Sequence, residues 1–230
     1  MPAKPCAQRP PTPRRARSHA TFYDRLSVFY DWIAEASERK PRRRALRALA
    51  AARGERILEL GVGTGRALPA LVRAVGPEGR VLGIDLATRM LRVARRHIAS
   101  LKLERAVALQ RGDARALPYR SEGLDAVFMS FTLELFDEAE IPVVLGEARR
   151  VLRRGGRLCV VSLVEGNPTT RRARLYRWFR RRWPRLIDCR PIALDAFLKQ
   201  AAFRPESTET SDVSGLPVRV VVATKPAGSP

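Results

Sequence analysis

The stretch RILELGVGTGRALPAL, residues 56–71, decides how the rest of the chain is interpreted. Its first five residues are mostly apolar, which is typical of a short strand, and ALPALVRAV at 67–75 has helical spacing. Between the two lie Gly61, Gly63 and Gly65. Because glycine adopts positive φ and lets a ligand come close to the backbone, this strand, turn and helix predict a ligand site at the end of the strand.

Short apolar runs and helical patterns alternate along the chain beyond this stretch. The runs predict strands at 56–60, 80–85, 106–110, 124–130 and 156–164, and the helical patterns lie at 67–75, 87–100 and 138–152. A short helix is expected at 193–202, followed by a hairpin of two strands, 203–212 and 217–225, around Gly215. Upstream, one helix is expected to end at Pro41 and a second to cover 41–51. Alternating strands and helices predict an α/β fold with a parallel sheet covered by helices on both faces.

Two acids follow the ends of the second and third predicted strands. Asp85 lies 24 residues after Gly61 and can accept hydrogen bonds from ribose hydroxyls, and Asp113 can accept from an adenine amino group. The glycine spacing is GxGxG, and Glu59 lies just before it, which suits the ammonium group of an amino acid better than a pyrophosphate. The alternative for either aspartate is a helix cap or a turn. Together with the glycines, the acids predict an adenosine-containing ligand.

These motifs, in this order, resemble those of the class I S-adenosylmethionine-dependent methyltransferases. The matching segments are ELGVGTG, GID, GDA with LPY, and LRRGGRL before the fifth strand. Within that superfamily, YDRLSVFYDW and MSFTLELFD look like the ubiquinone/menaquinone C-methyltransferase group, which also resembles bacterial phospholipid N-methyltransferases. The resemblance implies a Rossmann-like, doubly wound, seven-stranded sheet, mostly parallel with its last strand antiparallel. It also implies S-adenosylmethionine as the methyl donor.

The resemblance further implies a division of the chain and a set of donor-binding residues. It places the methyltransferase domain at 21–225, with a helical lid at 21–53 and a basic, aromatic insertion on the acceptor side at 165–190, and a tail at 226–230. Residues 1–20 are expected to be a disordered basic arm from their composition, because they are rich in proline and arginine and have no periodic apolar residues. The residues expected at the methionine part of the donor are Glu59, Gly61, Gly63 and Gly65, and those at the adenosine are Asp85, Leu86, Met90, Gly112, Asp113 and Ala114. Those expected to close over the donor are Ser130, Phe131, Leu133 and Tyr23, with Tyr30 beside it; for the two tyrosines core packing is the alternative.

The acceptor is left open by the sequence. WIAEASERKPRRR (32–44) stands where the quinone enzymes carry a polar stretch rich in Asn, Ser and Gly. Glu134 is a candidate general base, although a surface or helix-cap position is favoured for it, and no catalytic residue is assigned. The first hypothesis is a methyltransferase for a small or lipid-like acceptor. The alternatives are an RNA-modifying methyltransferase and a donor-binding basic module without catalysis.

The charge of the chain bears on its partners. Lys and Arg number 44 against 23 Asp and Glu, a net charge of +21, and without the five basic residues of the N-terminal arm it is still +16. Such a field favours anionic lipid or nucleic acid, unless it only reflects an arginine-rich composition. The three cysteines have no spacing typical of a zinc site, so no metal is expected. Because the cysteines are sparse and odd in number, a reducing cytoplasm is expected as the location. No apolar run approaches the roughly 18–20 residues of a membrane span, so a soluble protein is expected, with contact to an anionic membrane as one option.

The most basic segment is RRARLYRWFRRRWPRLIDCR, residues 171–190. If it is helical, Leu175, Tyr176, Phe179 and Trp183 share one side, and arginines occupy the opposite one. This division favours an amphipathic cover packed on the domain over a surface for stacking bases. Three interpretations stay open: a structural cover with incidental arginines, a lipid contact, and, least favoured, a nucleic-acid contact.

Overall fold

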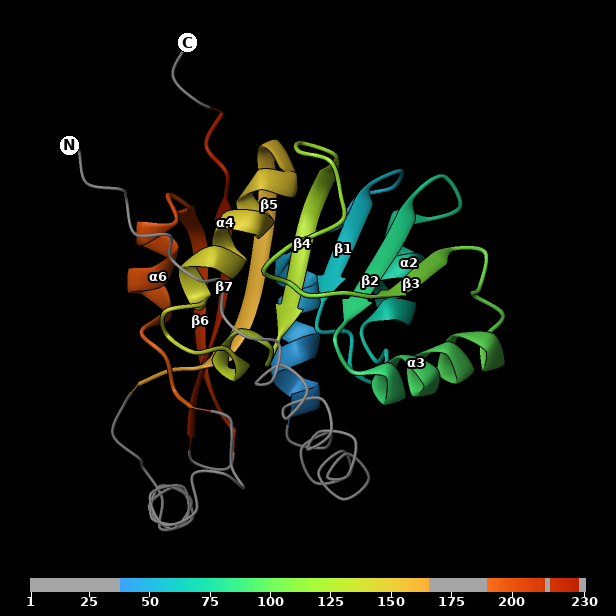
Figure 1. The fold of residues 1–230 in the computed structure, drawn as a ribbon, viewed down its shortest axis with the longest axis horizontal. Coiled ribbons are helices and arrows are strands. Elements are labelled where there is room, and N and C mark those ends of the chain that lie inside the picture. Colours follow the sequence, from blue (N-terminus) through green and yellow to red (C-terminus); the bar gives the residue numbers. More distant parts are fainter. Residues whose placement is uncertain (1–37, 166–189, 214–215, 228–230) are drawn as a thin grey trace, which may run out of the picture.

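The computed structural model describes residues 38–165, 190–213 and 216–227 (Figure 1). Several predictions concern parts of the chain outside these ranges. They are the basic arm at 1–20, the helix carrying Tyr23 and Tyr30, the basic stretch 171–189, the turn at Gly215 and the last residues of the tail. These five expectations therefore stay predictions.

The core of the fold is one seven-stranded sheet with the order β3-β2-β1-β4-β5-β7-β6. The strands are β1 (Arg56–Leu60), β2 (Arg80–Asp85), β3 (Val107–Arg111), β4 (Leu124–Ser130), β5 (Leu152–Leu163), β6 (Arg204–Val213) and β7 (Leu216–Thr224). Neighbours among β1 to β5 pair in parallel, and β7 runs antiparallel between β5 and β6. The predicted doubly wound α/β sheet with an antiparallel last strand is confirmed.

Helices cover both faces of the sheet, as the alternating pattern predicts (Figure 1). The helix over residues 38–48, α2 (Leu68–Val75) and α3 (Thr88–Ser100) bury apolar side chains in one cluster with Ile57 and Phe128. On the other face, α4 (Ile141–Val151) and α6 (Leu194–Gln200) pack in a second cluster with Leu58 and Val127. Successive residues of a strand point to opposite faces, so each central strand contributes to both clusters.

Several predicted boundaries are wrong. The helix over 38–48 continues through Pro41, because the φ of proline suits a helix and only one backbone hydrogen bond is lost. Helix α4 begins at Ile141 and not at 138. The fifth strand begins at Leu152, since the expected turn LRRGGRL runs on as strand, with a register shift opposite Leu124 and Gly155 at a φ of 70°.

Candidate donor site

The three glycines after β1 serve different purposes. Each has a positive φ: 69° at Gly61, 54° at Gly63 and 78° at Gly65. A Cβ on Gly61 would lie 2.4 Å from the side chain of Thr132, and one on Gly65 would lie 3.1 Å from Cβ of Ala94. At Gly63 a Cβ would meet no heavy atom within 4 Å. Packing therefore explains two of the glycines, and only Gly63 offers bare backbone to a ligand.

Two buried polar atoms beside this loop have no partner in the described part of the chain. They are Oε2 of Glu59, whose side chain is buried, and Oγ of Ser130. Glu59 pairs in register with Phe128, and the alternation of β4 brings Ser130 to the same face as Phe128. Both atoms therefore lie on one face of adjacent parallel strands, near their carboxyl ends. Buried polar groups are rarely left unpaired, so this pair points to a polar ligand.

The electrostatic environment of Glu59 is also unusual. Burial raises its pKa to about 8; the charge of Arg42 opposes the shift, and the charge of Asp85 adds to it. Arg42 lies on the helix 38–48 and pairs with Glu38 at 3.1 Å, so it is only partly committed to Glu59. A cationic group placed at Oε2 would stabilise the carboxylate form.

Asp85 shapes the glycine loop from the end of β2. Its Oδ2 accepts a hydrogen bond from the amide of Gly63 at 2.8 Å, and its Oδ1 accepts one from the amide of Ala87 at 2.8 Å, at the start of α3. Burial raises its pKa, and these backbone donors oppose the shift. The turn alternative for Asp85 is thus met, whereas the helix-cap alternative is not, since no side chain caps α3. Since a carboxylate has about four acceptor positions, Asp85 can still accept from ribose hydroxyls.

Asp113 follows β3 and is engaged by its neighbour Arg115. Nε of Arg115 lies 3.0 Å from both carboxylate oxygens, Nη2 lies 2.5 Å from Oδ2, and the amide of Arg115 donates to Oδ1 at 2.9 Å. The guanidinium holds the pKa of Asp113 below its ordinary value. Gly112 joins this strand end to β2, because its amide donates to the carbonyl of Asp85 at 3.1 Å.

The other predicted donor residues are placed at the same edge but differ in accessibility. Leu86 is exposed, Met90 and Phe131 are half-buried, and Ala114 is nearly buried. Leu133 is fully buried in the α4 cluster, so its side chain offers no surface to a ligand in this structure. Phe131 has a φ of 54°, a strained conformation for a non-glycine residue at the end of β4.

Glu134 is not at the surface, and that expectation is wrong. It lies in the 3₁₀ turn η1 (Leu133–Leu135) and is 1% exposed. Its Oε2 accepts from Oγ of Ser162 at 3.0 Å and its Oε1 from the amide of Leu163 at 3.2 Å. Burial raises its pKa to about 7, although these donors oppose the shift. The partners come from β5, which is why the sequence around Glu134 gives no sign of them.

Three residues that shape the site were not predicted. Thr132 donates to the carbonyl of Leu60 at 3.1 Å and fills the space that Gly61 leaves. Arg42 approaches Glu59 from the first described helix. Arg115 is the only one with a sequence signal, since it stands two residues after Asp113, at the spacing of a local ion pair.

Taken together, the site fits the amino-acid part and the nucleoside part of S-adenosylmethionine. The unpaired Oε2 of Glu59 suits its ammonium group, and the bare backbone at Gly63 leaves room for a close approach. Asp85 lies at the end of the neighbouring strand, where a carboxylate could accept hydrogen bonds from a ribose. The donor set contains carboxylates, a hydroxyl and backbone, and nothing in it requires a phosphate.

Comparison with known proteins agrees with this fit. Residues 57–156 match the family model described as "Methyltransferase domain". Residues 57–156 thus carry a methyltransferase domain, and the chain resembles the class I S-adenosylmethionine-dependent methyltransferases in motifs and fold. The resemblance inferred from the motifs is thereby confirmed, including its likeness to the quinone methyltransferases, since relatives with that name are found.

Two curated relatives and one solved structure illustrate the similarity of this methyltransferase domain. The chain is 37% identical over 140 residues to a phosphatidylethanolamine N-methyltransferase of Cereibacter sphaeroides, covering 61% of this chain and 65% of the relative. It is 32% identical over 143 residues to a demethylmenaquinone methyltransferase of Lactobacillus johnsonii, covering 62% of this chain and 57% of the relative. The crystal structure of the [4+2]-cyclase SpnF superposes with a TM-score of 0.73 at 18% identity, over 93% of this chain and 97% of that one. The matched part thus spans less than two thirds of both curated relatives.

Within the described ranges, no helix is long and apolar enough to cross a membrane.

Proposed function

We propose that this protein transfers a methyl group from S-adenosylmethionine to a small or lipid-like acceptor. The observation that carries the proposal is the buried Oε2 of Glu59, unpaired within the described residues, beside a loop in which Gly63 alone of the three glycines faces open space. The names of the curated relatives support a lipid-like acceptor, because one is a phosphatidylethanolamine methyltransferase and the other a demethylmenaquinone methyltransferase.

In the proposed reaction the protein binds and aligns the donor. The donor supplies a methyl group activated by its sulfonium, so that catalysis rests largely on alignment and exclusion of water. Glu59 would hold the ammonium and Asp85 the ribose, while Ser130 offers a hydroxyl from the adjacent strand. Glu134 is a poor candidate for a general base, because both of its oxygens accept hydrogen bonds within the buried core.

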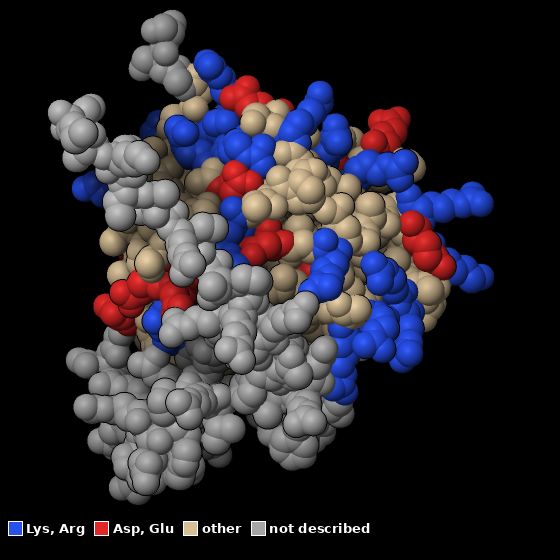
Figure 2. Space-filling model, in the orientation of Figure 1, with Lys and Arg blue, Asp and Glu red and all other residues tan. Residues whose placement is uncertain are grey.

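The surface of α3 supports a further part of the proposal, peripheral contact with an anionic membrane. The helix TRMLRVARRHIAS carries four arginines and no acid, and Leu86, Val93 and Leu101 along it are exposed. A groove of about 310 Å³ beside the glycine loop is lined by Thr64, Arg66, Val93, Arg96, His97 and Ser100. Figure 2 shows blue side chains over the side of the molecule that bears α3, with few red ones among them. Arginines beside exposed apolar groups suit anionic headgroups.

The acceptor class is tested by methyl transfer from radiolabelled S-adenosylmethionine. Phosphatidylethanolamine, a quinone-precursor extract and total RNA are supplied in separate reactions. Label in a lipid or quinone fraction supports the proposal, and label in RNA alone would replace it with the RNA-modifying alternative. No label in any fraction, with donor binding intact, would favour a donor-binding fold with other chemistry. The cyclase neighbour shows that this fold is not confined to methyl transfer.

The membrane part is tested by sedimentation with vesicles that contain or lack anionic lipid. Arg92→Glu on α3 is compared with Arg73→Glu on α2, because both arginines are exposed and both changes alter the charge equally. Weaker sedimentation for Arg92→Glu than for Arg73→Glu is expected. Equal loss for both would mean that only net charge matters, and binding independent of anionic lipid would overturn this part.

A further inference from the structure

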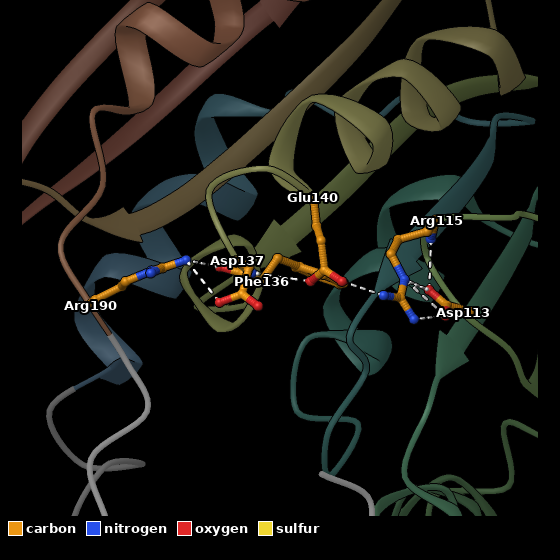
Figure 3. Close-up of polar contacts among 6 residues, drawn as sticks. All are labelled: Asp113, Arg115, Phe136, Asp137, Glu140 and Arg190. Carbon is orange, nitrogen blue, oxygen red and sulfur yellow. Dashed lines mark hydrogen bonds and ion pairs between the residues drawn. The ribbon is translucent and has the colours of Figure 1, made fainter. Parts of the chain in front are cut away.

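The loop between β4 and α4 is held from two sides by arginines that come from distant parts of the chain (Figure 3). On one side Arg115, after β3, pairs through Nη1 with Oε1 of Glu140, while the rest of its guanidinium binds Asp113. On the other side Arg190 donates to the carbonyl of Phe136 at 2.7 Å and lies 3.5 Å from Asp137. The loop residues 136–140 therefore lie between two fixed guanidinium groups.

Glu140 links the Arg115 contact to the backbone of this loop. Its Oε2 accepts from the amide of Asp137 at 3.1 Å, and its own amide donates to the carbonyl of Asp137 at 2.7 Å. The amide of Ile141, the first residue of α4, also donates to that carbonyl at 3.1 Å. These bonds close a turn just before α4. The contact of Arg115 with Glu140 therefore restrains the backbone of the whole loop and not only one side chain.

The loop is joined through η1 to the residues at the end of β4. Only the short turn η1 separates it from Ser130 and Phe131, which lie at the rim of the donor site. Phe131 holds a positive φ, so surrounding contacts must keep it in this conformation. We expect that releasing the loop on either side loosens the segment that leads back to Ser130 and Phe131, with Glu134 in η1 still bonded to β5.

We infer that Arg115 and Arg190 are positioning residues that act together: they clamp the 136–140 loop and thereby hold the end of β4 against the donor. Arg115 also bonds Asp113 and so links this loop to the part of the site predicted to bind adenine. The inference rests on the proposed function in one respect, that the ligand at this edge of the sheet is S-adenosylmethionine.

The test measures binding of S-adenosylhomocysteine, the demethylated donor, by calorimetric titration of the full chain. Arg115→Gln is expected to weaken binding about tenfold and Arg190→Gln a few-fold, and the double variant less than the product of the two. The free-energy effects of two substitutions that act on the same element are coupled in this way, whereas the effects of substitutions at independent sites are additive. Glu140→Ala is expected to behave like Arg115→Gln, because it removes both acceptor oxygens that link Arg115 to the loop and leaves the pair of Arg115 with Asp113 intact.

Arg150→Gln is the matched control. Arg150 has a side chain 34% exposed against 36% for Arg115, and it also pairs with a glutamate, Glu147, and donates to two backbone carbonyls. Its removal should lower the free energy of unfolding in urea by a similar amount but leave the affinity for S-adenosylhomocysteine within about twofold, since no contact of Arg150 touches the loop.

Three outcomes would overturn the inference. They are full affinity in Arg115→Gln and Arg190→Gln, full affinity in Glu140→Ala alone, and an equal loss in Arg150→Gln. The first would leave the proposed function standing, provided the wild type binds S-adenosylhomocysteine. The second would mean that Arg115 acts only on Asp113, and the third that stability alone controls binding. A wild type that does not bind S-adenosylhomocysteine would overturn the proposed function and the clamp with it.

Discussion

Glu59 and Glu134 are both buried carboxylates at the carboxyl edge of the sheet, yet their surroundings differ. Each is at most 3% exposed, and burial raises the pKa of each, to about 8 for Glu59 and about 7 for Glu134. Both oxygens of Glu134 accept hydrogen bonds, from Ser162 and Leu163. Oε2 of Glu59 has no partner within the described residues. Burial alone therefore does not distinguish a structural acid from one that binds a ligand, whereas the state of its hydrogen bonds does.

The largest difference is expected in stability. Glu134→Ala removes the acceptor for the amide of Leu163 and the hydroxyl of Ser162, both buried, and should lower the free energy of unfolding by about 3 kcal/mol. Glu59→Ala removes a carboxyl whose Oε2 has no partner within the described residues and should change stability by less than about 1 kcal/mol. Urea denaturation followed by circular dichroism measures both. Equal losses in the two variants would show that the contrast in hydrogen bonding has no energetic meaning.

Donor affinity should show the opposite order. Glu59→Gln removes the charge proposed to bind the donor ammonium, and since hydrogen bonds to charged groups contribute about 1.5–3 kcal/mol, binding of S-adenosylhomocysteine should weaken roughly 10- to 100-fold. Glu134→Gln should stay within about threefold of the wild type, because it keeps the shape of the buried side chain. Calorimetric titration gives both constants. Were Glu134→Gln the weaker binder, the roles assigned to the two acids would be exchanged.

How much of this contrast could be predicted depends on where the partners of each residue lie. Glu59 and Asp85 follow from local motifs, because a strand, its glycine turn and the next strand end are close in sequence. The burial of Glu134 could not be predicted, since its partners lie on β5, 28 and 29 residues away. Arg42 approaches Glu59 only through the docking of a helix on the sheet. Periodicity therefore predicted the elements and the edge where the site lies, but not which side chains meet across it.

The pH dependence of donor binding should separate the two acids next. Without ligand the pKa of Glu59 is about 8, and an ammonium at its Oε2 would lower it, because the carboxylate form gains a partner. Below pH 8, binding must then release a proton, so the affinity for S-adenosylhomocysteine should rise between pH 6 and pH 7.5, by at most about tenfold per unit. The affinity of Glu59→Gln should lack this rise with pH, and the affinity of Glu134→Gln should change with pH as that of the wild type does. A wild-type profile already as flat as that of Glu59→Gln would contradict the assignment.

The smallest effect is expected from Ser162→Ala, which removes one donor from Glu134 and leaves Glu59 untouched. The free energy of unfolding should fall by about 1 kcal/mol, the usual contribution of a single hydrogen bond.

The pH dependence of this loss tests whether the hydroxyl acts through the carboxylate of Glu134. Since the folded pKa of Glu134, about 7, lies above the ordinary value for glutamate, the stability linked to its proton is present at low pH and is lost as pH rises through 7. Losing the hydroxyl of Ser162 disfavours the ionised form further, so the deficit of Ser162→Ala should be larger at pH 8 than at pH 6. Urea denaturation at the two pH values measures this, with Ser162→Ala in the Glu134→Gln background as control. A deficit of equal size at both pH values would mean that the hydroxyl does not act through the carboxylate of Glu134.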